Sequence, residues 1–129
     1  MKPAFLIIAA ALMIWSCSSN KNTTKTSAVL TQIEQDSTEY ELIVIDNHFD
    51  QWYQLNYSEA KDRSEDYYRS KNLFAVQTWN EFYRLGKYPD VIDSYINYQP
   101  QLDYGIELNR KLFWYFKYVE DYYKVNLNF

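Results

Sequence analysis

Few side chains in this sequence have the types and spacing that catalysis requires. His48 is the single histidine and lies between Asp46 and Asp50, and a histidine beside carboxylates can act as a general acid or base. The same composition is typical of the start of a helix, where Asp accepts hydrogen bonds from free backbone N–H groups, and we favour that interpretation. One histidine and one cysteine are too few for an ordinary zinc site, and the two isolated glycines exclude a glycine-rich phosphate loop. We therefore predict no metal site and no cofactor.

Carboxylates are the other candidates for chemistry, since a glycosidase needs only a suitably spaced pair of Asp or Glu side chains. The candidates are Asp46, Asp50, Asp103 and Glu107. Helix capping and surface charge account for all four more simply. A Gly-x-Ser-x-Gly motif, which would position a serine nucleophile, is absent from the sequence. We expect no catalytic residues and a protein that is not an enzyme, with a carboxylate-based glycosidase as the third and weakest hypothesis.

Cys17, the single cysteine, has the most specific chemical context. It ends the tetrapeptide Ile14-Trp15-Ser16-Cys17, after an unbroken apolar run of twelve residues from Ala4 to Trp15. That run has the length of a signal-peptide core and is shorter than the ~20 residues that a membrane-spanning helix needs. The tetrapeptide resembles the lipobox of bacterial lipoproteins, although its tryptophan is bulkier than usual. The resemblance implies that residues 1–16 are a cleaved signal peptide and that Cys17 carries the lipid.

A lipid on Cys17 would make a membrane the first partner of this protein. In the lipoproteins that the N-terminus resembles, the non-acidic sequence Ser18-Ser19-Asn20 is compatible with sorting to the outer membrane. We expect the inner leaflet of that membrane, facing the periplasm, with the cell surface or the inner membrane as alternatives. The formal net charge is −4 and gives no basic footprint for a nucleic-acid backbone, so we expect no nucleic-acid partner.

The chain divides by composition into a tether and a body. Residues 17–37 are rich in Ser, Thr, Asn and Lys, with a weak apolar patch at Ala28-Val29-Leu30. This composition is typical of a disordered tether, and twenty flexible residues span about 25 Å. We expect one globular domain over residues 38–129.

Alternation and helical periodicity predict the elements of the body. Residues 39–46 have strand composition with apolar side chains on both faces, which suggests a strand covered on both sides. A short helix should follow to about residue 55, and Tyr95 to Tyr98 and the last residues of the chain could add short strands. Two long helices are predicted, one over residues 64–85 between a Ser64 cap and Gly86, and one over residues 103–123. The expected fold is therefore α+β and helix-rich, with two long helices packed on a small sheet.

The body also resembles a family of short, functionally uncharacterised lipoproteins of Gram-negative bacteria, classed as a domain of unknown function. The residues that carry the resemblance are Glu41-Leu42-Ile43-Val44-Ile45-Asp46, Phe49, Trp52, Tyr67-Tyr68, Thr78-Trp79-Asn80, Tyr88-Pro89, Ile96-Asn97-Tyr98, Pro100, Asp103-Tyr104-Gly105 and Glu107-Leu108-Asn109. None of these motifs is a known catalytic signature. The resemblance implies a location and a fold rather than an activity.

Aromatic side chains are the remaining signal, because Trp, Tyr and Phe make up 19% of the chain. On the last predicted helix, Trp114 lies on the charged face with Arg110, Lys117 and Tyr118, either in a second packing layer or as a contact site. We predict a partner surface formed by these four residues, with cation–π contacts holding the indole flat.

Two classes of function remain open. The first is a non-catalytic structural or interaction module that binds an envelope protein, and the oligomeric state is open. The second is a glycan or peptidoglycan binder. Sugar binding would require two or three aromatic residues lining a shallow groove with amides between them, whereas protein binding would require a flatter patch with a polar rim.

Overall fold

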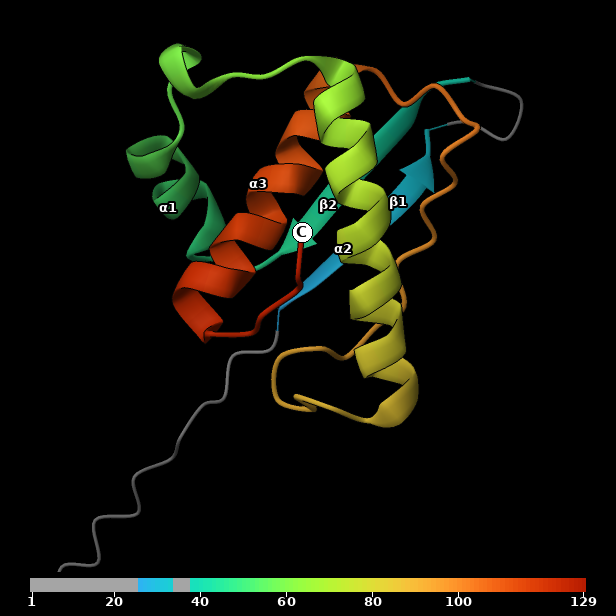
Figure 1. Cartoon of the computed structure of the whole chain (residues 1–129), viewed down its shortest axis with the longest axis vertical. Helices are drawn as coiled ribbons and strands as arrows, with labels where there is room; N and C mark the ends of the chain where they lie inside the picture. Colours follow the sequence, from blue (N-terminus) through green and yellow to red (C-terminus); the bar gives the residue numbers. More distant parts are fainter. Residues whose placement is uncertain (1–25, 34–37) are drawn as a thin grey trace, which may run out of the picture.

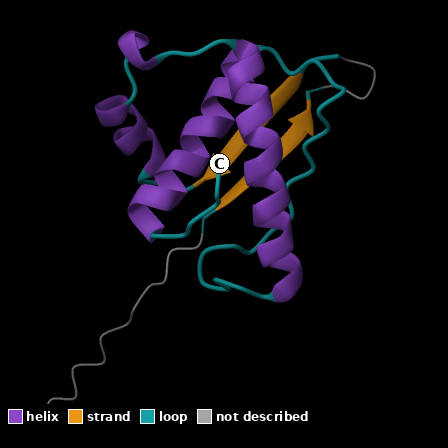
Figure 2. Cartoon of the chain, in the orientation of Figure 1, coloured by secondary structure: helices purple, strands orange, loops and turns teal. Residues whose placement is uncertain are grey.

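The structure is a computed structural model that describes residues 26–33 and 38–129. The predicted signal peptide, Cys17 and the start of the predicted tether lie outside the described residues. The order of elements is two strands, a short helix, a 3₁₀ turn and two long helices (Figures 1 and 2). Their bounds are β1 Ser27–Gln32, β2 Tyr40–Ile45, α1 Phe49–Asn56, η1 Glu59–Lys61, α2 Glu65–Leu85 and α3 Ile106–Tyr123. This arrangement confirms the predicted α+β fold.

The two strands form an antiparallel sheet, and α2 and α3 lie across one of its faces (Figure 1). The register places Ser27 opposite Ile45 and Gln32 opposite Tyr40. A single parallel bridge joins Thr26 to Ile92, so the start of β1 also touches the segment that follows α2. The sheet and the long helices enclose the core (Figure 2).

β1 lies inside the segment that the sequence predicted to be a flexible tether, so the predicted start of the domain at residue 38 is wrong. Ala28 is fully buried in the core, and the Thr26 hydroxyl hydrogen-bonds the Tyr115 hydroxyl at 3.0 Å. The strand forms because β2 supplies a complete antiparallel partner for a segment in which only Ala28, Val29 and Leu30 are apolar. The described part of the folded body therefore begins at Thr26.

The long helix α2 has the predicted bounds because both of its ends carry local signals. The Ser64 side chain accepts a hydrogen bond from the backbone N–H of Tyr67 at 3.2 Å, which caps the first turn. Gly86 ends the helix in the left-handed conformation, with φ at 66°. The buried side chains of α2 are Tyr68, Asn72, Ala75, Val76 and Trp79.

The last helix, α3, starts later and is buried on a wider face than predicted. Gly105 is its N-cap, and Asp103 instead accepts a hydrogen bond from the Gly105 backbone N–H at 3.2 Å. α3 packs against α1, α2 and β2, so side chains around most of its circumference are covered. Eight of them are buried: Leu108, Asn109, Leu112, Phe113, Tyr115, Phe116, Tyr118 and Val119.

Two further segments are not strands, contrary to the sequence prediction. The segment from Tyr95 to Tyr98 and the tail after α3 have no strand assignment. Both still contribute to the core, since Ile96 and Leu127 are at most 1% exposed. The burial of alternate side chains explains why the sequence pattern looked like a strand.

Within residues 26–33 and 38–129, the helices cover one face of the sheet only, which corrects the prediction that β2 is covered on both sides. Ala28 and Leu42 point into the core, whereas Val29, Ile43 and Ile45 are exposed by 42%, 43% and 60%. Figure 1 shows α2 and α3 on the first face. Among the described residues, no helix is long and apolar enough to cross a membrane.

Candidate functional site

The Asp46 carboxylate, one half of the His48 pair considered from the sequence, is a buried junction between elements. Its Oδ1 accepts a hydrogen bond from the His48 backbone N–H at 2.9 Å and lies 3.5 Å from His48 Nδ1. Its Oδ2 accepts hydrogen bonds from the Tyr123 hydroxyl at 2.7 Å and the Tyr118 hydroxyl at 3.0 Å. His48 is the N-cap residue of α1, as the helix-start interpretation predicted.

The hydrogen bonds around Asp46 decide its charge. Burial alone would raise its pKa, but the His48 backbone N–H and the hydroxyls of Tyr123, Thr26 and Tyr118 outweigh burial and lower the pKa. A carboxylate with a lowered pKa and its lone pairs occupied is a poor general acid or base near neutral pH. The hydrogen bonds of Asp46 instead connect the end of β2 to the start of α1 and to α3.

One of the other candidate carboxylates borders a pocket. Asp103 lines a pocket of about 410 Å³ together with Glu39, and Asp46, Asp50 and Glu107 do not line it. Within residues 26–33 and 38–129, no three His, Cys, Asp or Glu side chains are grouped so that they could hold a metal ion.

The predicted partner surface on α3 is largely covered, which corrects that prediction for Tyr118. Tyr118 is fully buried, and its ring packs against Phe49 and Trp52 of α1 at centroid distances of 5.6 Å and 5.5 Å. A helical wheel of α3 alone places Tyr118 on the charged face. The wheel does not include α1, which packs over that side of α3 and covers Tyr118. Burial is also the largest of the causes that raise the pKa of Tyr118.

Trp114 lies in the same second layer. Its ring centroid is 6.2 Å from that of Trp52, 6.3 Å from that of Tyr53 and 5.7 Å from that of Tyr57. The indole is half-buried, and it keeps one edge on a shallow pocket of about 300 Å³ that Lys117 also lines. The packing alternative that the sequence left open therefore describes Trp114 better than the contact-site alternative.

The two cations of the predicted surface also have partners other than Trp114. Arg110 donates two hydrogen bonds of 2.8 Å to the Asp62 carboxylate, and its guanidinium lies over the Tyr57 ring. The bond from Arg110, with a second from Tyr68, lowers the pKa of Asp62 to about 2. Lys117 lies over the Phe129 ring at 4.7 Å and pairs with Glu120 at 3.6 Å. The predicted cation–π contacts to the indole are therefore wrong.

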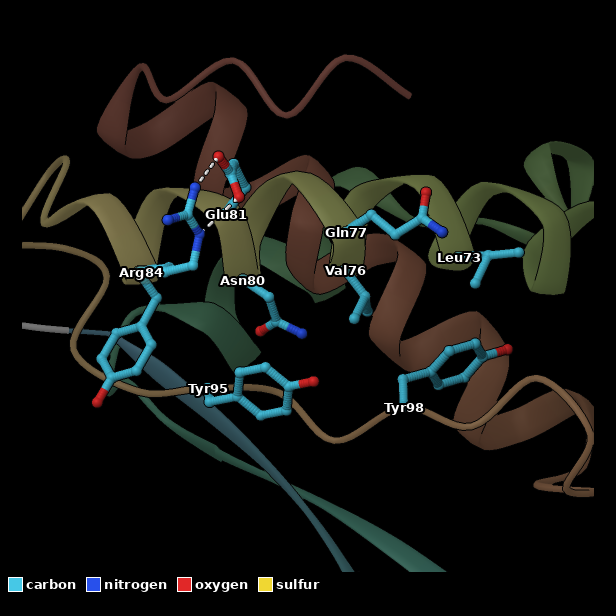
Figure 3. Close-up of a pocket in the computed structure, with 9 residues that line it drawn as sticks. Leu73, Val76, Gln77, Asn80, Glu81, Arg84, Tyr95 and Tyr98 are labelled. Carbon is cyan, nitrogen blue, oxygen red and sulfur yellow. Dashed lines mark hydrogen bonds and ion pairs between the residues drawn. The ribbon is translucent and has the colours of Figure 1, made fainter.

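A groove that the sequence analysis did not identify runs between α2 and the extended segment at residues 94–98 (Figure 3). It has a volume of about 580 Å³, within the usual range for small-ligand sites. We call it the tyrosine groove, after the three tyrosines among its lining residues. It is lined by Leu73, Val76, Gln77, Asn80, Glu81, Tyr83, Arg84, Tyr95 and Tyr98.

One wall of the tyrosine groove is the extended segment, which α2 holds by side-chain hydrogen bonds. The Asn80 amide donates to the Ile96 carbonyl and accepts from the Ile96 backbone N–H, both at 2.9 Å, as a neighbouring strand would. Trp79 Nε1 donates to the Ser94 carbonyl at 2.7 Å. The fixed backbone sends Ile96 into the core and leaves Tyr95 61% exposed at the groove.

The three tyrosines of the groove differ in how far their side chains are exposed. Tyr98 is buried, its hydroxyl hydrogen-bonds Asn109 Oδ1 at 2.9 Å, and burial raises its pKa to about 12. Tyr95 and Tyr83 are 61% and 44% exposed. In Figure 3, Val76 and Asn80 point from α2 toward the segment that carries Tyr95 and Tyr98. The groove thus combines one fixed and two accessible phenol rings.

Polar groups border the groove on the α2 side. Arg84 donates hydrogen bonds of 3.0 Å and 2.6 Å to Glu81, and this contact raises the pKa of Arg84 and lowers that of Glu81 (Figure 3). Both side chains are thus charged at neutral pH. The Gln77 amide is exposed. Aromatic walls, an apolar floor and a polar rim form an arrangement suited to binding a small ligand.

Comparison with known proteins identifies the family of this chain, and the function of that family is unknown. Residues 5–129 match the family described as a family of unknown function (DUF6146), and the chain belongs to it. The match includes most of the apolar run, Cys17 and the whole described body. No curated protein and no solved structure matches the chain.

Proposed function

We propose that this member of DUF6146 is a non-catalytic, lipid-anchored module of the bacterial cell envelope whose tyrosine groove binds a glycan. The observation that carries the glycan assignment is the groove itself, in which Tyr83, Tyr95 and Tyr98 line a concave site of about 580 Å³ with a polar rim. Sugar rings present apolar C–H faces to aromatic rings and hydroxyl groups to amides and charged groups. Gln77 and the Glu81–Arg84 pair are the polar groups in reach of such hydroxyls.

The glycan proposal takes precedence over the envelope-protein partner expected from the sequence. That expectation required an open surface around Trp114 and Tyr118. In the structure Trp114 is half-buried and Tyr118 is fully buried. Sugar binding was expected to need two or three aromatic residues in a shallow groove with amides between them. The tyrosine groove has three tyrosines and two amides, Gln77 and Asn80. The Asn80 amide is already hydrogen-bonded to the Ile96 backbone, so Gln77 is the amide left for a sugar.

The anchoring part of the proposal is supported by the N-terminal sequence. The apolar run, the tetrapeptide ending at Cys17 and the following Ser18-Ser19-Asn20 together favour acylation and the periplasmic face of the outer membrane. The match to the family extends through Cys17, so the anchor segment belongs to the shared sequence.

Replacing the accessible tyrosines should weaken glycan binding without unfolding the domain. We expect the double variant Tyr83→Ala/Tyr95→Ala to sediment with purified peptidoglycan at least about tenfold less than the wild type, because losing two stacking faces removes more than about 1.4 kcal/mol. The matched control is Tyr122→Ala, a tyrosine that is 49% exposed on α3 and does not line the groove. Equal sedimentation of all three proteins, at equal thermal stability, would refute the glycan assignment.

Acylation is tested separately in the living cell. Cys17→Ser should abolish the incorporation of labelled palmitate and release the protein from the membrane fraction, since serine supplies no thiol for the thioether. Cys17 is the single cysteine, so no other thiol can compensate. Persistent palmitate labelling of Cys17→Ser would contradict the anchor assignment and leave the groove assignment untouched.

A further inference from the structure

The outer face of the sheet, opposite the helices, is unusually apolar. Val29, Ile43 and Ile45 are exposed by 42%, 43% and 60%. In an antiparallel sheet with one face in water, the outward positions are normally polar. Here three of the six outward positions are β-branched aliphatic residues that lie together, and an exposed apolar cluster of this kind marks a contact surface.

The register makes these side chains one patch. Val29 lies directly opposite Ile43, and Ile45 lies opposite Ser27 in the same direction of the pleat. Side chains that are directly opposite or diagonal on one face are within contact distance of each other. We call Val29, Ile43 and Ile45 the outer sheet patch, and Figure 1 shows α2 and α3 on the other side of the strands that carry it.

We propose that the outer sheet patch rests on the surface of the lipid bilayer to which Cys17 anchors the chain. The inference depends on the proposed acylation of Cys17 and deepens it, because it fixes which side of the domain faces the membrane. The occupant is therefore the lipid interface, and not a second copy of the chain.

The length of chain between anchor and sheet supports this occupant. Thr26 follows Cys17 by nine positions, and nine residues cover at most about 30 Å even when fully extended, or about 17 Å as a flexible coil. A domain of about 100 residues has a radius of gyration of about 13 Å, so such a connection keeps the domain beside the headgroups. Ile45, the most exposed residue of the patch, lies opposite Ser27, one position after Thr26. The patch thus begins where the anchor segment joins the sheet.

Charge indicates what kind of lipid surface the patch contacts. The outward positions of the two strands are Ser27, Val29, Thr31, Glu41, Ile43 and Ile45, so the one charged residue among them is acidic. Anionic headgroups would repel Glu41, and a basic rim that would attract them is missing from these positions. The contact is therefore apolar, and zwitterionic lipid should support it fully.

The test places a fluorescent reporter on the patch. The acylated protein carrying Ile45→Cys is labelled with an environment-sensitive fluorophore, and the Cys17 sulfur cannot compete because the thioether consumes its thiol. The protein is reconstituted into phosphatidylcholine–phosphatidylethanolamine vesicles that contain a nitroxide-bearing phospholipid. The control is Leu55→Cys, which places the label on α1 at a side chain that is 78% exposed.

We expect the label on Ile45→Cys to shift to the blue and to be quenched at least about threefold more than the label on Leu55→Cys. Equal, weak quenching of both labels in vesicle-bound protein would overturn the inference while leaving the anchor intact. A blue shift without lipid quenching, together with concentration-dependent crosslinking through Ile45→Cys, would assign the patch to a second copy and overturn it as well. Protein that takes up no palmitate and does not float with vesicles would refute the anchor, and this inference with it.

Discussion

Asp46 connects the end of β2, the start of α1 and the last turns of α3. Each of its two carboxylate oxygens has partners from a different element, with His48 of the α1 cap on one side and Tyr118 and Tyr123 of α3 on the other. A group that is 9% exposed and holds three donors leaves those donors unsatisfied when it is removed. Asp46, one of the four carboxylates considered for catalysis from the sequence, is therefore a stabilising residue.

Asp46→Ala should destabilise the domain by about 2–4 kcal/mol at pH 7, because it leaves buried hydroxyl and N–H donors without an acceptor. The pKa of Asp46 is lowered in the folded state, so the charged carboxylate stabilises the fold above the ordinary Asp pKa of about 4, and this contribution is lost as the pH falls below it. Urea unfolding at pH 7 and pH 3 measures both effects, with the exposed Asp90→Ala as the control. A gap between wild type and Asp46→Ala that stays constant across this pH range would show that the charge of Asp46 contributes nothing.

At the scale of single residues, sequence reasoning succeeded where the environment is local and failed where a second layer intervenes. His48 was placed at a helix start from its two neighbouring aspartates, and it is the N-cap of α1. Tyr118 was placed on an open face because a helical wheel assumes one core side, but α3 is covered by α1 as well as by α2 and β2. The position of α1 depends on contacts such as Trp52 with Tyr118, which no periodicity within α3 reveals.

At the scale of elements, α2 could be predicted almost to the residue and β1 could not be predicted at all. Ser64 and Gly86 are cap signals that act within one turn of the chain, so the sequence alone shows both ends of α2. β1 has a short apolar run, Ala28-Val29-Leu30, inside a polar segment, and it becomes a strand through its pairing with β2 and the burial of Ala28. The tyrosine groove was missed for a related reason, because its extended wall pairs with the Asn80 side chain instead of a strand.

Asn80→Ala should loosen this wall, since it removes both hydrogen bonds to the Ile96 backbone at a cost of about 1–3 kcal/mol. We expect faster hydrogen exchange at the Ile96 amide and weaker peptidoglycan sedimentation, because Tyr95 loses its fixed position. Asn80→Asp keeps the acceptor for the Ile96 N–H and loses the donor to its carbonyl, so it should be intermediate in both measurements. Unchanged protection of the Ile96 amide in Asn80→Ala would show that the core contacts of Ile96 hold the wall without help.

At the scale of the whole molecule, the helix α3 organises the fold and β1 completes it. α3 contacts β2 and both other helices. Its Tyr115 is fully buried and forms a hydrogen bond with Thr26, at the N-terminal end of the described body. If Cys17 carries the proposed lipid, the same connection sets the distance between the anchor and the sheet. The start of the folded body therefore matters for the stability of the domain and for the proposed placement at the membrane.

Truncation compares the boundary that the sequence predicted with the one that the structure gives. A chain of residues 26–129 should unfold cooperatively like the full mature protein. A chain of residues 38–129 should lose about 4 kcal/mol or more, because it lacks the backbone hydrogen bonds of a six-residue strand, each contributing about 0.5–1.5 kcal/mol, and the buried Ala28. A loss of that size is a large share of the total stability of a small domain, so circular dichroism melts should show a lower and broader transition. If both chains melted alike, β1 would be a dispensable addition to a domain that begins at residue 38, and the anchor would be separated from the body by the long tether after all.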